Sequence, residues 1–286
     1  MKEKISIIMP VFNEEKGIAG VIRDIKNTLV SCNYEYEIIV VDDGSTDQSV
    51  KMALKEGAKV ITNKRNKGYG ASIMTGIKNS DGEFVAIIDG DGSYAAKDLL
   101  NLTRHIKEND MVVGARTKPG INEPFLRRID KFFLKKLASY LIEMKIPDLN
   151  SGLRIMRRDR LSEFLRILPK GYSLTTTVTL LFLNSDFNVE FIPIDYKKRR
   201  GKSKIRPVHD TLIFMQLIIR TVIYFNPLKV FLPVSIFLFA SAIFILFYSR
   251  FIMGRVMDIT TIVLIVASLQ LLATGMIADL IIRRTK

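Results

Sequence analysis

The chain has 286 residues, a net charge of +14 and one cysteine, so it is long enough for one large or two small domains and cannot form an internal disulfide. A pI of about 9.8 favours an anionic partner: nucleic acid, a membrane surface or a phosphorylated substrate. Hydrophobic residues make up 48% of the chain, and their excess lies after residue 208. The first residues contain no long apolar segment, so we expect no signal peptide. The single thiol, Cys32, suggests a reducing, cytoplasmic setting.

Short apolar runs alternate with helical patterns through the first part of the chain. The runs predict strands at 5–10, 36–41, 59–62, 84–89, 111–114, 153–156 and 188–196. Strands that alternate with helices of roughly a dozen residues indicate βαβ units around a mostly parallel sheet, which is an α/β fold.

The glycine pattern argues against a dinucleotide-binding domain. Such a domain carries its glycine-rich fingerprint in the first βα turn. Here that turn, 9–15, contains no glycine, and the tight pair Gly68 and Gly70 follows the third strand. We therefore expect neither NAD nor FAD, and the lysine-bearing phosphate loop is absent as well.

The fourth predicted strand ends in two carboxylates, Asp89 and Asp91, separated by Gly90. Ligands of open α/β sheets bind beyond the carboxyl ends of the strands. Two acids on backbone loosened by glycine could hold a hard divalent cation that also grips a diphosphate. The alternative is a simple turn, since Asp and Gly are common turn residues.

The final part of the chain is apolar in three segments. Residues 206–228 form a pattern typical of an amphipathic helix, either in a membrane surface or packed on the preceding domain. Residues 230–248 and 259–278 contain no charge, and each stretch is long enough to cross a hydrocarbon core of about 30 Å. The short connection between them predicts a transmembrane hairpin, with the second span ending near residue 280.

Positive charge predicts the orientation of the hairpin. Basic residues at 197–206 precede the first span and others follow the second, whereas the connecting loop has only Arg250 and Arg255. We therefore expect a multi-pass protein of the cell membrane with both termini in the cytoplasm. The predicted domains are a cytoplasmic domain at 1–205, a juxtamembrane helix at 206–228 and two spans within 229–286.

Five motifs appear in the order seen in one enzyme family. They are PVFNEE (10–15), VDDGSTD (41–47), DGD (89–91), NSG (150–152) and RGKSK (200–204). On these motifs the chain resembles the polyprenyl-phosphate glycosyltransferases, in particular the dolichol-phosphate mannose synthase group of the inverting family-2 enzymes. The resemblance spans about residues 4–206. It implies a GT-A fold and transfer of a hexose, with inversion, from a nucleotide sugar to a polyprenyl phosphate.

The resemblance also implies roles for individual residues. The donor would contact Pro10, Phe12, Glu14, Val41, Asp43, Asp89, Gly90 and Asp91. A Mg²⁺ or Mn²⁺ ion would bind Asp89 and Asp91, with Ser93 standing where the mannose synthase pattern has glutamine. Asp91, Asp148 and Arg116 would be catalytic, with Asp148 orienting the acceptor or acting as a base. The phosphates of donor and acceptor would meet Arg116, Arg127 and Arg200. For Asp42 and Asp47, loop structure and helix capping are the alternative to a ligand role, and we favour it for Asp47.

The sequence leaves open the sugar donor, the class of protein and the oligomeric state. GDP-mannose is the first choice of donor, with UDP-glucose and UDP-N-acetylglucosamine as the others. A processive polysaccharide synthase is disfavoured, since the chain has no tryptophan for the Gln-x-x-Arg-Trp motif. A non-catalytic, membrane-tethered nucleotide-binding module is a second class. We expect no nucleic-acid partner, because lipid headgroups better explain basic residues such as Lys202 and Lys204 beside the spans. Paired spans also permit a homo-oligomer.

Overall fold

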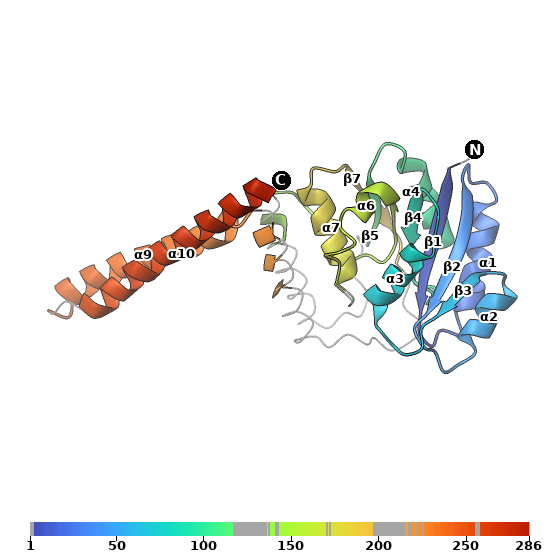
Figure 1. Ribbon diagram of the computed structural model, residues 1–286, viewed down its shortest axis with the longest axis horizontal. Coiled ribbons are helices and arrows are strands. Elements are labelled where there is room, and N and C mark those ends of the chain that lie inside the picture. Colours follow the sequence, from blue (N-terminus) through green and yellow to red (C-terminus); the bar gives the residue numbers. More distant parts are fainter. Residues whose placement is uncertain are drawn as a thin grey trace. The chain divides into compact units, whose positions relative to one another are not determined.

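The computed structural model describes most of the chain in two compact units, Met1–Phe214 and Met215–Lys286 (Figure 1). The described residues are 3–116, 136, 138–140, 143–169, 171, 173–196, 215–216, 219–220, 222–224, 226–254 and 258–285. The boundary predicted at residue 205 lies outside these ranges. Most of the predicted juxtamembrane helix does too, so that helix stays a prediction.

The described part of the first unit contains a seven-stranded sheet. Its strands are β1 (Lys4–Val11), β2 (Glu35–Asp42), β3 (Lys59–Thr62), β4 (Phe84–Ile87), β5 (Met111–Arg116), β6 (Arg154–Arg157) and β7 (Val189–Ile194). They lie in the order β3-β2-β1-β4-β6-β5-β7. All pairs are parallel except those of β6, which runs antiparallel to both β4 and β5. The predicted mostly parallel α/β sheet is confirmed, and β6 is its one reversed strand.

Helices cover both faces of the sheet, which explains why the strands read as continuous apolar runs. They are α1 (Ile18–Leu29), α2 (Ser49–Lys55), α3 (Tyr69–Lys78), α4 (Ala96–His105), α6 (Arg158–Ser162) and α7 (Leu174–Asn184). Helices α1, α2 and α4 share a buried core with Ile7 and Met9 of β1. Helix α3 lies on the opposite face, where Gly76 packs closely against Ile8 and Val41.

The direction of the strands gathers several loops at one edge. Parallel strands β1, β2 and β4 all end there, and so do β5 and β7, because two reversals restore the original direction. The reversed strand β6 begins at this edge, so the loop that precedes it arrives there as well. Segments that are more than 100 residues apart in sequence therefore meet at one place.

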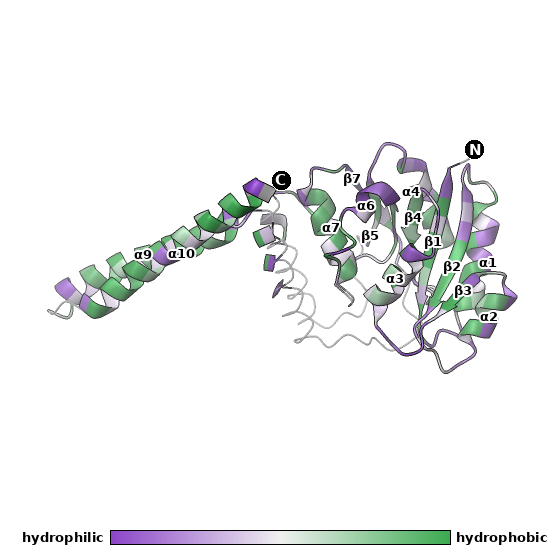
Figure 2. Ribbon diagram, in the orientation of Figure 1, coloured by the Kyte–Doolittle hydropathy of each residue, from purple (hydrophilic) through white to green (hydrophobic). Residues whose placement is uncertain are grey.

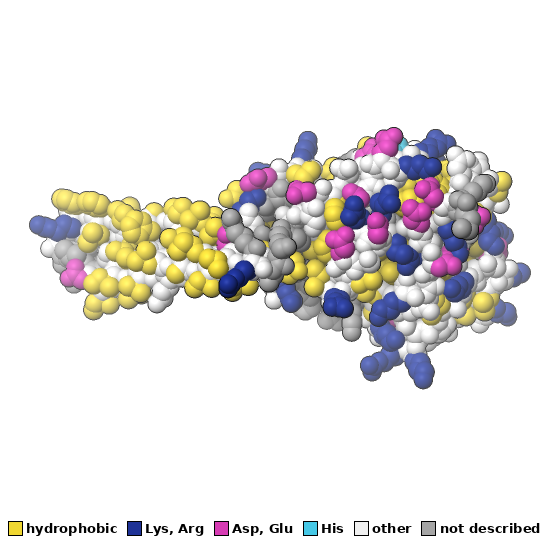
Figure 3. Space-filling view, turned by 45° about the horizontal axis from the view of Figure 1, so that its top comes forward, with side chains coloured by type: hydrophobic (Ala, Val, Ile, Leu, Met, Phe, Trp, Pro, Cys, Tyr) yellow, Lys and Arg dark blue, Asp and Glu magenta, His cyan; other side chains and the backbone are white. Residues whose placement is uncertain are grey.

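The second unit contains two long apolar helices, α9 (Leu228–Phe251) and α10 (Asp258–Thr285), that pack against each other as a hairpin (Figure 2). Their most apolar windows are only 11% and 17% buried, so neither is the core helix of a soluble domain. Hydrophobic side chains cover the face of the hairpin seen in Figure 3. Both helices are long and apolar enough to cross a membrane, as the sequence predicts.

Candidate active site

A cavity of about 400 Å³ opens at the edge where these strands end. Eight of the residues predicted for the site line it: Pro10, Phe12, Glu14, Asp43, Asp89, Gly90, Asp91 and Arg116. Residues without a predicted role also line the cavity, among them Asn66, Tyr69, Ser72, Tyr94, Asn150, Gly152, Thr175 and Tyr196. Acidic, aromatic and basic side chains therefore line one open cavity.

The acidic pair lies just beyond the end of β4. Asp89 Oδ1 accepts a hydrogen bond of 2.9 Å from the Tyr69 hydroxyl, and Asp91 Oδ1 accepts one of 2.9 Å from the backbone N–H of Ser93. A Cβ atom on Gly152 would lie 2.7 Å from Asp89 Oδ2, so any residue other than glycine would displace the Asp89 carboxylate. The loop before β6 and the end of β4 are thus fitted to each other.

Side-chain hydrogen bonds join the loops after β1 and β2. The backbone N–H of Asn13 donates to Ser45 Oγ at 2.9 Å, and Asn13 Oδ1 accepts from the backbone N–H of Thr46 at 2.8 Å. Asn13 has φ of 56°, a left-handed conformation that asparagine tolerates better than most residues. Asp47 accepts hydrogen bonds from Glu15 and Ser49, which fits the structural role favoured for it. These bonds hold the Pro10 to Glu14 wall of the cavity.

Asp43 organises a third loop. Its carboxylate accepts three hydrogen bonds of 2.8–3.0 Å, from the Asn63 side chain and from the backbone N–H groups of Lys67 and Gly68. Gly68 has φ of 96°, which a residue with a side chain rarely adopts. Asp43 still lines the cavity. Asp43 therefore holds the 63–68 loop in place beside the cavity, and its side chain is also positioned to contact a ligand.

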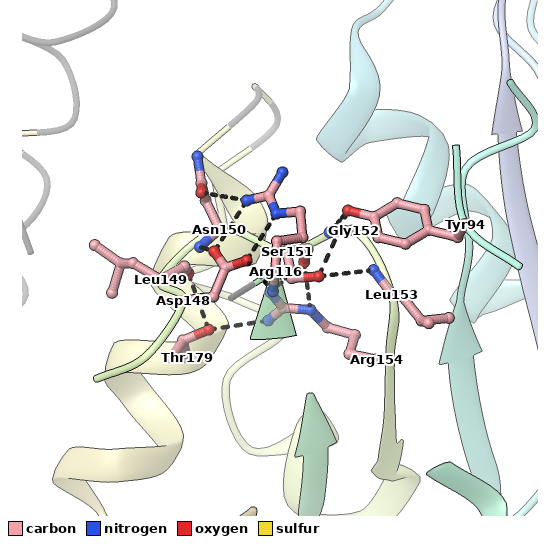
Figure 4. Close-up of polar contacts among 10 residues, drawn as sticks. All are labelled: Tyr94, Arg116, Asp148, Leu149, Asn150, Ser151, Gly152, Leu153, Arg154 and Thr179. Carbon is pink, nitrogen blue, oxygen red and sulfur yellow. Dashed lines mark hydrogen bonds and ion pairs between the residues drawn. The ribbon is translucent and has the colours of Figure 1, made fainter. Parts of the chain in front are cut away.

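Arg116 and Asp148 form a bidentate ion pair at the end of β5 (Figure 4). Arg116 Nε lies 2.7 Å from Asp148 Oδ2, and Nη2 lies 2.9 Å from Oδ1 and 2.8 Å from the Asn150 side-chain oxygen. Burial alone would raise the pKa of the Asp148 carboxyl, but the bonds from Arg116 outweigh it and hold that pKa below its usual value. Such a carboxylate is a weak base and a good anchor for a guanidinium.

Tyrosine rings form another wall of the cavity. The Tyr94 hydroxyl accepts a 2.7 Å hydrogen bond from the backbone N–H of Gly152, and its ring meets that of Tyr196 edge-on at 5.1 Å. The Arg116 guanidinium lies 5.3 Å from the centre of the Tyr196 ring, within the range of a cation–π interaction. Burial raises the pKa of the Tyr69, Tyr94 and Tyr196 phenols, so all three stay protonated near neutral pH and can donate hydrogen bonds.

A fully buried arginine, Arg154, forms hydrogen bonds that stabilise the loop before β6. Arg154 donates to the backbone oxygen of Ser151 at 2.6 Å and to the Thr179 hydroxyl at 3.1 Å (Figure 4). It also donates to the backbone oxygen of Thr175 at 2.8 Å. Burial lowers the pKa of this guanidinium to about 10, so it remains charged at neutral pH. Arg154 therefore ties the 150–152 motif to α7, and it places a positive charge within the protein beside the site.

Some predicted site residues lie elsewhere. Val41 is fully buried in the sheet and does not line the cavity. Ser93 is fully buried, and its hydroxyl makes no hydrogen bond of normal geometry to any residue that the structure describes. It is near enough to the Tyr196 phenol to affect the pKa of that group. Arg127, Arg200, Lys202 and Lys204 fall outside the described residues, so their roles remain predictions.

Sequence signals existed for some of the residues that were missed. Tyr69 belongs to the glycine pair after the third strand, and Asn150 and Gly152 belong to a motif already singled out. Tyr94 and Tyr196 stand alone in sequence, and only the strand directions bring them to the same edge. Arg154 belongs to a short predicted strand, and no feature of the sequence indicates that its side chain is buried.

Comparison with known proteins shows which family this chain belongs to. The profile of glycosyl transferase family 2 matches residues 6–165, which make up more than half of the chain. This range includes most of the residues that line the cavity. The chain belongs to glycosyl transferase family 2. A second profile, described as the GtrB C-terminal hairpin, matches residues 226–283, which contain α9 and most of α10. This family-2 protein is a glycosyltransferase, as its motifs predict.

Two curated relatives of this glycosyltransferase extend the comparison. A dodecaprenyl-phosphate galacturonate synthase of Rhizobium johnstonii is 27% identical, over 98% of this chain and 88% of that protein. A dolichyl-phosphate hexose transferase of Haloferax volcanii is 28% identical, over 72% of this chain and 88% of that protein.

Solved structures of the same fold exist. A glucosyl-3-phosphoglycerate synthase of Mycobacterium tuberculosis, solved with Mn²⁺, uridine diphosphate and phosphoglyceric acid, superposes with a TM-score of 0.62. It is 19% identical, over 77% of this chain and 78% of that one. The likeness confirms the predicted GT-A fold of this family-2 glycosyltransferase.

Proposed function

We propose that this glycosyltransferase moves a hexose from a nucleoside-diphosphate sugar to a polyprenyl phosphate at a membrane surface, with inversion at the anomeric carbon. One observation carries the proposal: a single cavity contains both the acidic pair Asp89 and Asp91 and the anchored cation Arg116. The names of both curated relatives support the acceptor, since each contains a polyprenyl phosphate. The apolar hairpin supports a substrate that stays in the bilayer.

The acidic pair suits a divalent cation, Mg²⁺ or Mn²⁺. Both ions prefer oxygen ligands, and carboxylates bind them well. Among the described residues no group of three or more His, Cys, Asp or Glu side chains could hold a metal, so the protein would supply Asp89 and Asp91 and leave other positions to the diphosphate and water. The buried Ser93 hydroxyl, which lacks a normal hydrogen bond, is a further candidate ligand. Such an ion would stabilise the negative charge of the departing diphosphate.

The reaction requires little proton transfer. A phosphate oxygen of the acceptor forms the new bond to the anomeric carbon, while the bond from that carbon to the diphosphate breaks and its electron pair leaves with the nucleoside diphosphate. Because the acceptor phosphate is already anionic near neutral pH, no strong base is needed. Asp148 then serves as the anchor that aims Arg116 at a phosphate, which agrees with its lowered pKa.

The hairpin of α9 and α10 would span the membrane, with both termini in the cytoplasm. The basic residues that flank its two ends support this orientation, since cytoplasmic segments are enriched in Lys and Arg. The first unit would then meet the headgroups of the acceptor lipid from the cytoplasmic side.

The donor sugar is the finer part of the proposal. GDP-mannose remains our first choice from the motifs, while the relatives are named for a galacturonate and a hexose. Binding and transfer should therefore be compared with GDP-mannose, UDP-glucose, UDP-N-acetylglucosamine and a galacturonate nucleotide. Transfer from a sugar nucleotide other than GDP-mannose alone would correct the donor and leave the reaction unchanged.

The decisive experiment replaces one acid of the pair. Asp91→Asn keeps the volume and removes the charge that would bind the cation, so we expect transfer to a polyprenyl phosphate with added Mn²⁺ to fall at least about a hundredfold. Asp24→Asn removes an exposed carboxylate of α1 and should leave the rate unchanged. Near-normal turnover of Asp91→Asn would contradict the assignment of the metal site.

A further inference from the structure

The middle of α10 exposes one polar side chain where an apolar surface is expected. Gln270 lies at the centre of the apolar stretch Asp258–Ile282, and its side chain is exposed. In the part of the chain that the structure describes, no hydrogen bond to its side-chain amide is found. An amide turned toward hydrocarbon without a partner is costly, since lipid tails offer no hydrogen bonds.

The hydroxyl groups of the same hairpin behave differently. Ser241 Oγ donates to Phe237 O at 2.8 Å, Ser268 Oγ to Ile265 O at 2.7 Å and Thr274 Oγ1 to the backbone oxygen of Gln270 at 2.8 Å. Ser235 Oγ donates across the hairpin to Ser268 O at 2.8 Å. These hydroxyls are satisfied within the hairpin, and the Gln270 amide stands out against them.

The two sides of α10 differ in burial. Thr261, Ser268 and Gly275 are buried at intervals of seven residues and face α9, where a Cβ atom on Gly275 would lie 2.7 Å from Phe231 Cβ. The opposite side carries exposed residues at alternating intervals of three and four. We call this set the outer seam; it consists of Val263, Val266, Gln270, Ala273 and Ile277.

The outer seam has the spacing at which two helices interlock, with a single polar position in an otherwise apolar row. Small Ala273, next to Gln270 along the seam, would let two backbones approach. A carboxamide carries both donors and an acceptor, so it is complementary to another copy of itself. Copies of one chain insert in the same orientation, so their α10 helices run parallel and place Gln270 opposite Gln270.

We propose that a second copy of this chain covers the outer seam, and that paired Gln270 amides hydrogen-bond across the interface between two α10 helices. The inference goes beyond the transfer reaction and rests only on the membrane placement of the hairpin. It assigns a chemistry and a surface to self-association: a parallel helix pair, apolar along its length and polar at one central layer.

The test measures association of the full-length protein in phosphatidylethanolamine and phosphatidylglycerol vesicles. Copies labelled at the amino terminus with a donor or an acceptor fluorophore are mixed at several protein-to-lipid ratios, and energy transfer gives the association constant. We expect Gln270→Leu to lower that constant about threefold to thirtyfold, the range measured for single polar contacts between membrane helices. Gln270→Asn keeps the amide and should retain most of the association.

Thr274→Val is the matched control, because it removes an exposed polar group that is already bonded to its own helix. It should associate as the wild type does. The proposal is overturned if the wild type shows no association at any ratio, if Gln270→Leu associates as strongly as the wild type, or if Thr274→Val weakens association equally. Transfer activity is measured on the same samples, and its absence in the wild type would contradict the proposed function without affecting the energy-transfer comparison.

Discussion

Gly152 shows how a single residue can control the acidic pair. The carboxylate of Asp89 occupies the volume that a side chain at position 152 would need, and the backbone N–H of Gly152 also bonds to the Tyr94 hydroxyl. The loop before β6 therefore fixes an acid that belongs to the end of β4. The glycine of the NSG motif (150–152) is needed because its backbone packs closely against the Asp89 carboxylate, not because a turn requires it.

Gly152→Ala should damage catalysis more than folding. The added methyl group would displace Asp89 by several tenths of an ångström, and small misplacements of catalytic groups cost roughly tenfold to a hundredfold in rate. Turnover and Mn²⁺ affinity are the measurements. Gly171→Ala is the control, since no atom of the described residues lies within 4 Å of a Cβ atom there. Wild-type turnover in Gly152→Ala would refute this reading of the site.

The Arg116–Asp148 pair is the other local device. The Asp148 side chain is 8% exposed and that of Arg116 is 22% exposed, so removal of the acid leaves a largely buried cation without its partner. We expect Asp148→Asn to destabilise the protein by about 3 kcal/mol at neutral pH. Thermal unfolding of the full chain measures the loss.

The pH dependence of this loss has a defined sign. Because the pKa of Asp148 is lowered on folding, its stabilisation is present above the ordinary carboxyl pKa of about 3.9 and disappears as the pH falls through the lowered value. The difference in melting temperature between wild type and Asp148→Asn should therefore narrow below about pH 4. Asp159→Asn, at an exposed carboxylate paired with Arg157, should show a small difference at neutral pH. A gap that stays constant down to pH 3 would count against the pairing argument.

Among the elements, β6 and α7 decide how the site is assembled. The reversed direction of β6 brings the 148–152 loop to the edge where the parallel strands end. Arg154, at the start of β6, then bonds both to this loop and to α7. The short apolar runs predicted the strands closely, because burial on both faces of a sheet leaves a continuous apolar signature. Strand direction leaves no such signature.

Arg154→Lys tests whether α7 and the loop depend on this link. A lysine keeps the charge, but one ammonium group cannot reproduce the fork that reaches Ser151 and Thr175. We expect a loss of about 2–4 kcal/mol, from two lost hydrogen bonds to a charged group. Turnover should fall as well, since the loop carries Asn150 and Gly152.

Arg157→Lys is the matched control on the same strand. Arg157 is part-exposed, forms two long ion pairs of 3.5–3.6 Å and lies 5.8 Å from the centre of the Phe84 ring, contacts that a lysine can also make. Its replacement should change the melting temperature little. Equal effects of the two substitutions would mean that Arg154 acts through charge alone.

At the scale of the whole molecule, the proposed topology of the hairpin would place the catalytic unit on one side of the membrane, and cysteine labelling tests it. In a Cys32→Ser background, Gly254→Cys in the hairpin loop should react with a membrane-impermeant maleimide added to intact cells. Glu108→Cys, at an exposed position of the first unit, should react only after the membrane is opened. Labelling of both positions from the same side would show that the hairpin does not cross.

The sequence by itself determined the α/β class, the acidic pair, the family motifs and the two apolar spans, because each depends on residues that are close in the chain. Only the tertiary structure decided that the 148–152 loop, Tyr94 and Tyr196 join the acidic pair, that Asp148 is held by Arg116, and that Val41 lies in the core. It also showed which side of α10 faces α9 and which leaves Gln270 exposed. These facts follow from strand direction and helix rotation, and both are fixed by packing between segments that are distant in the chain.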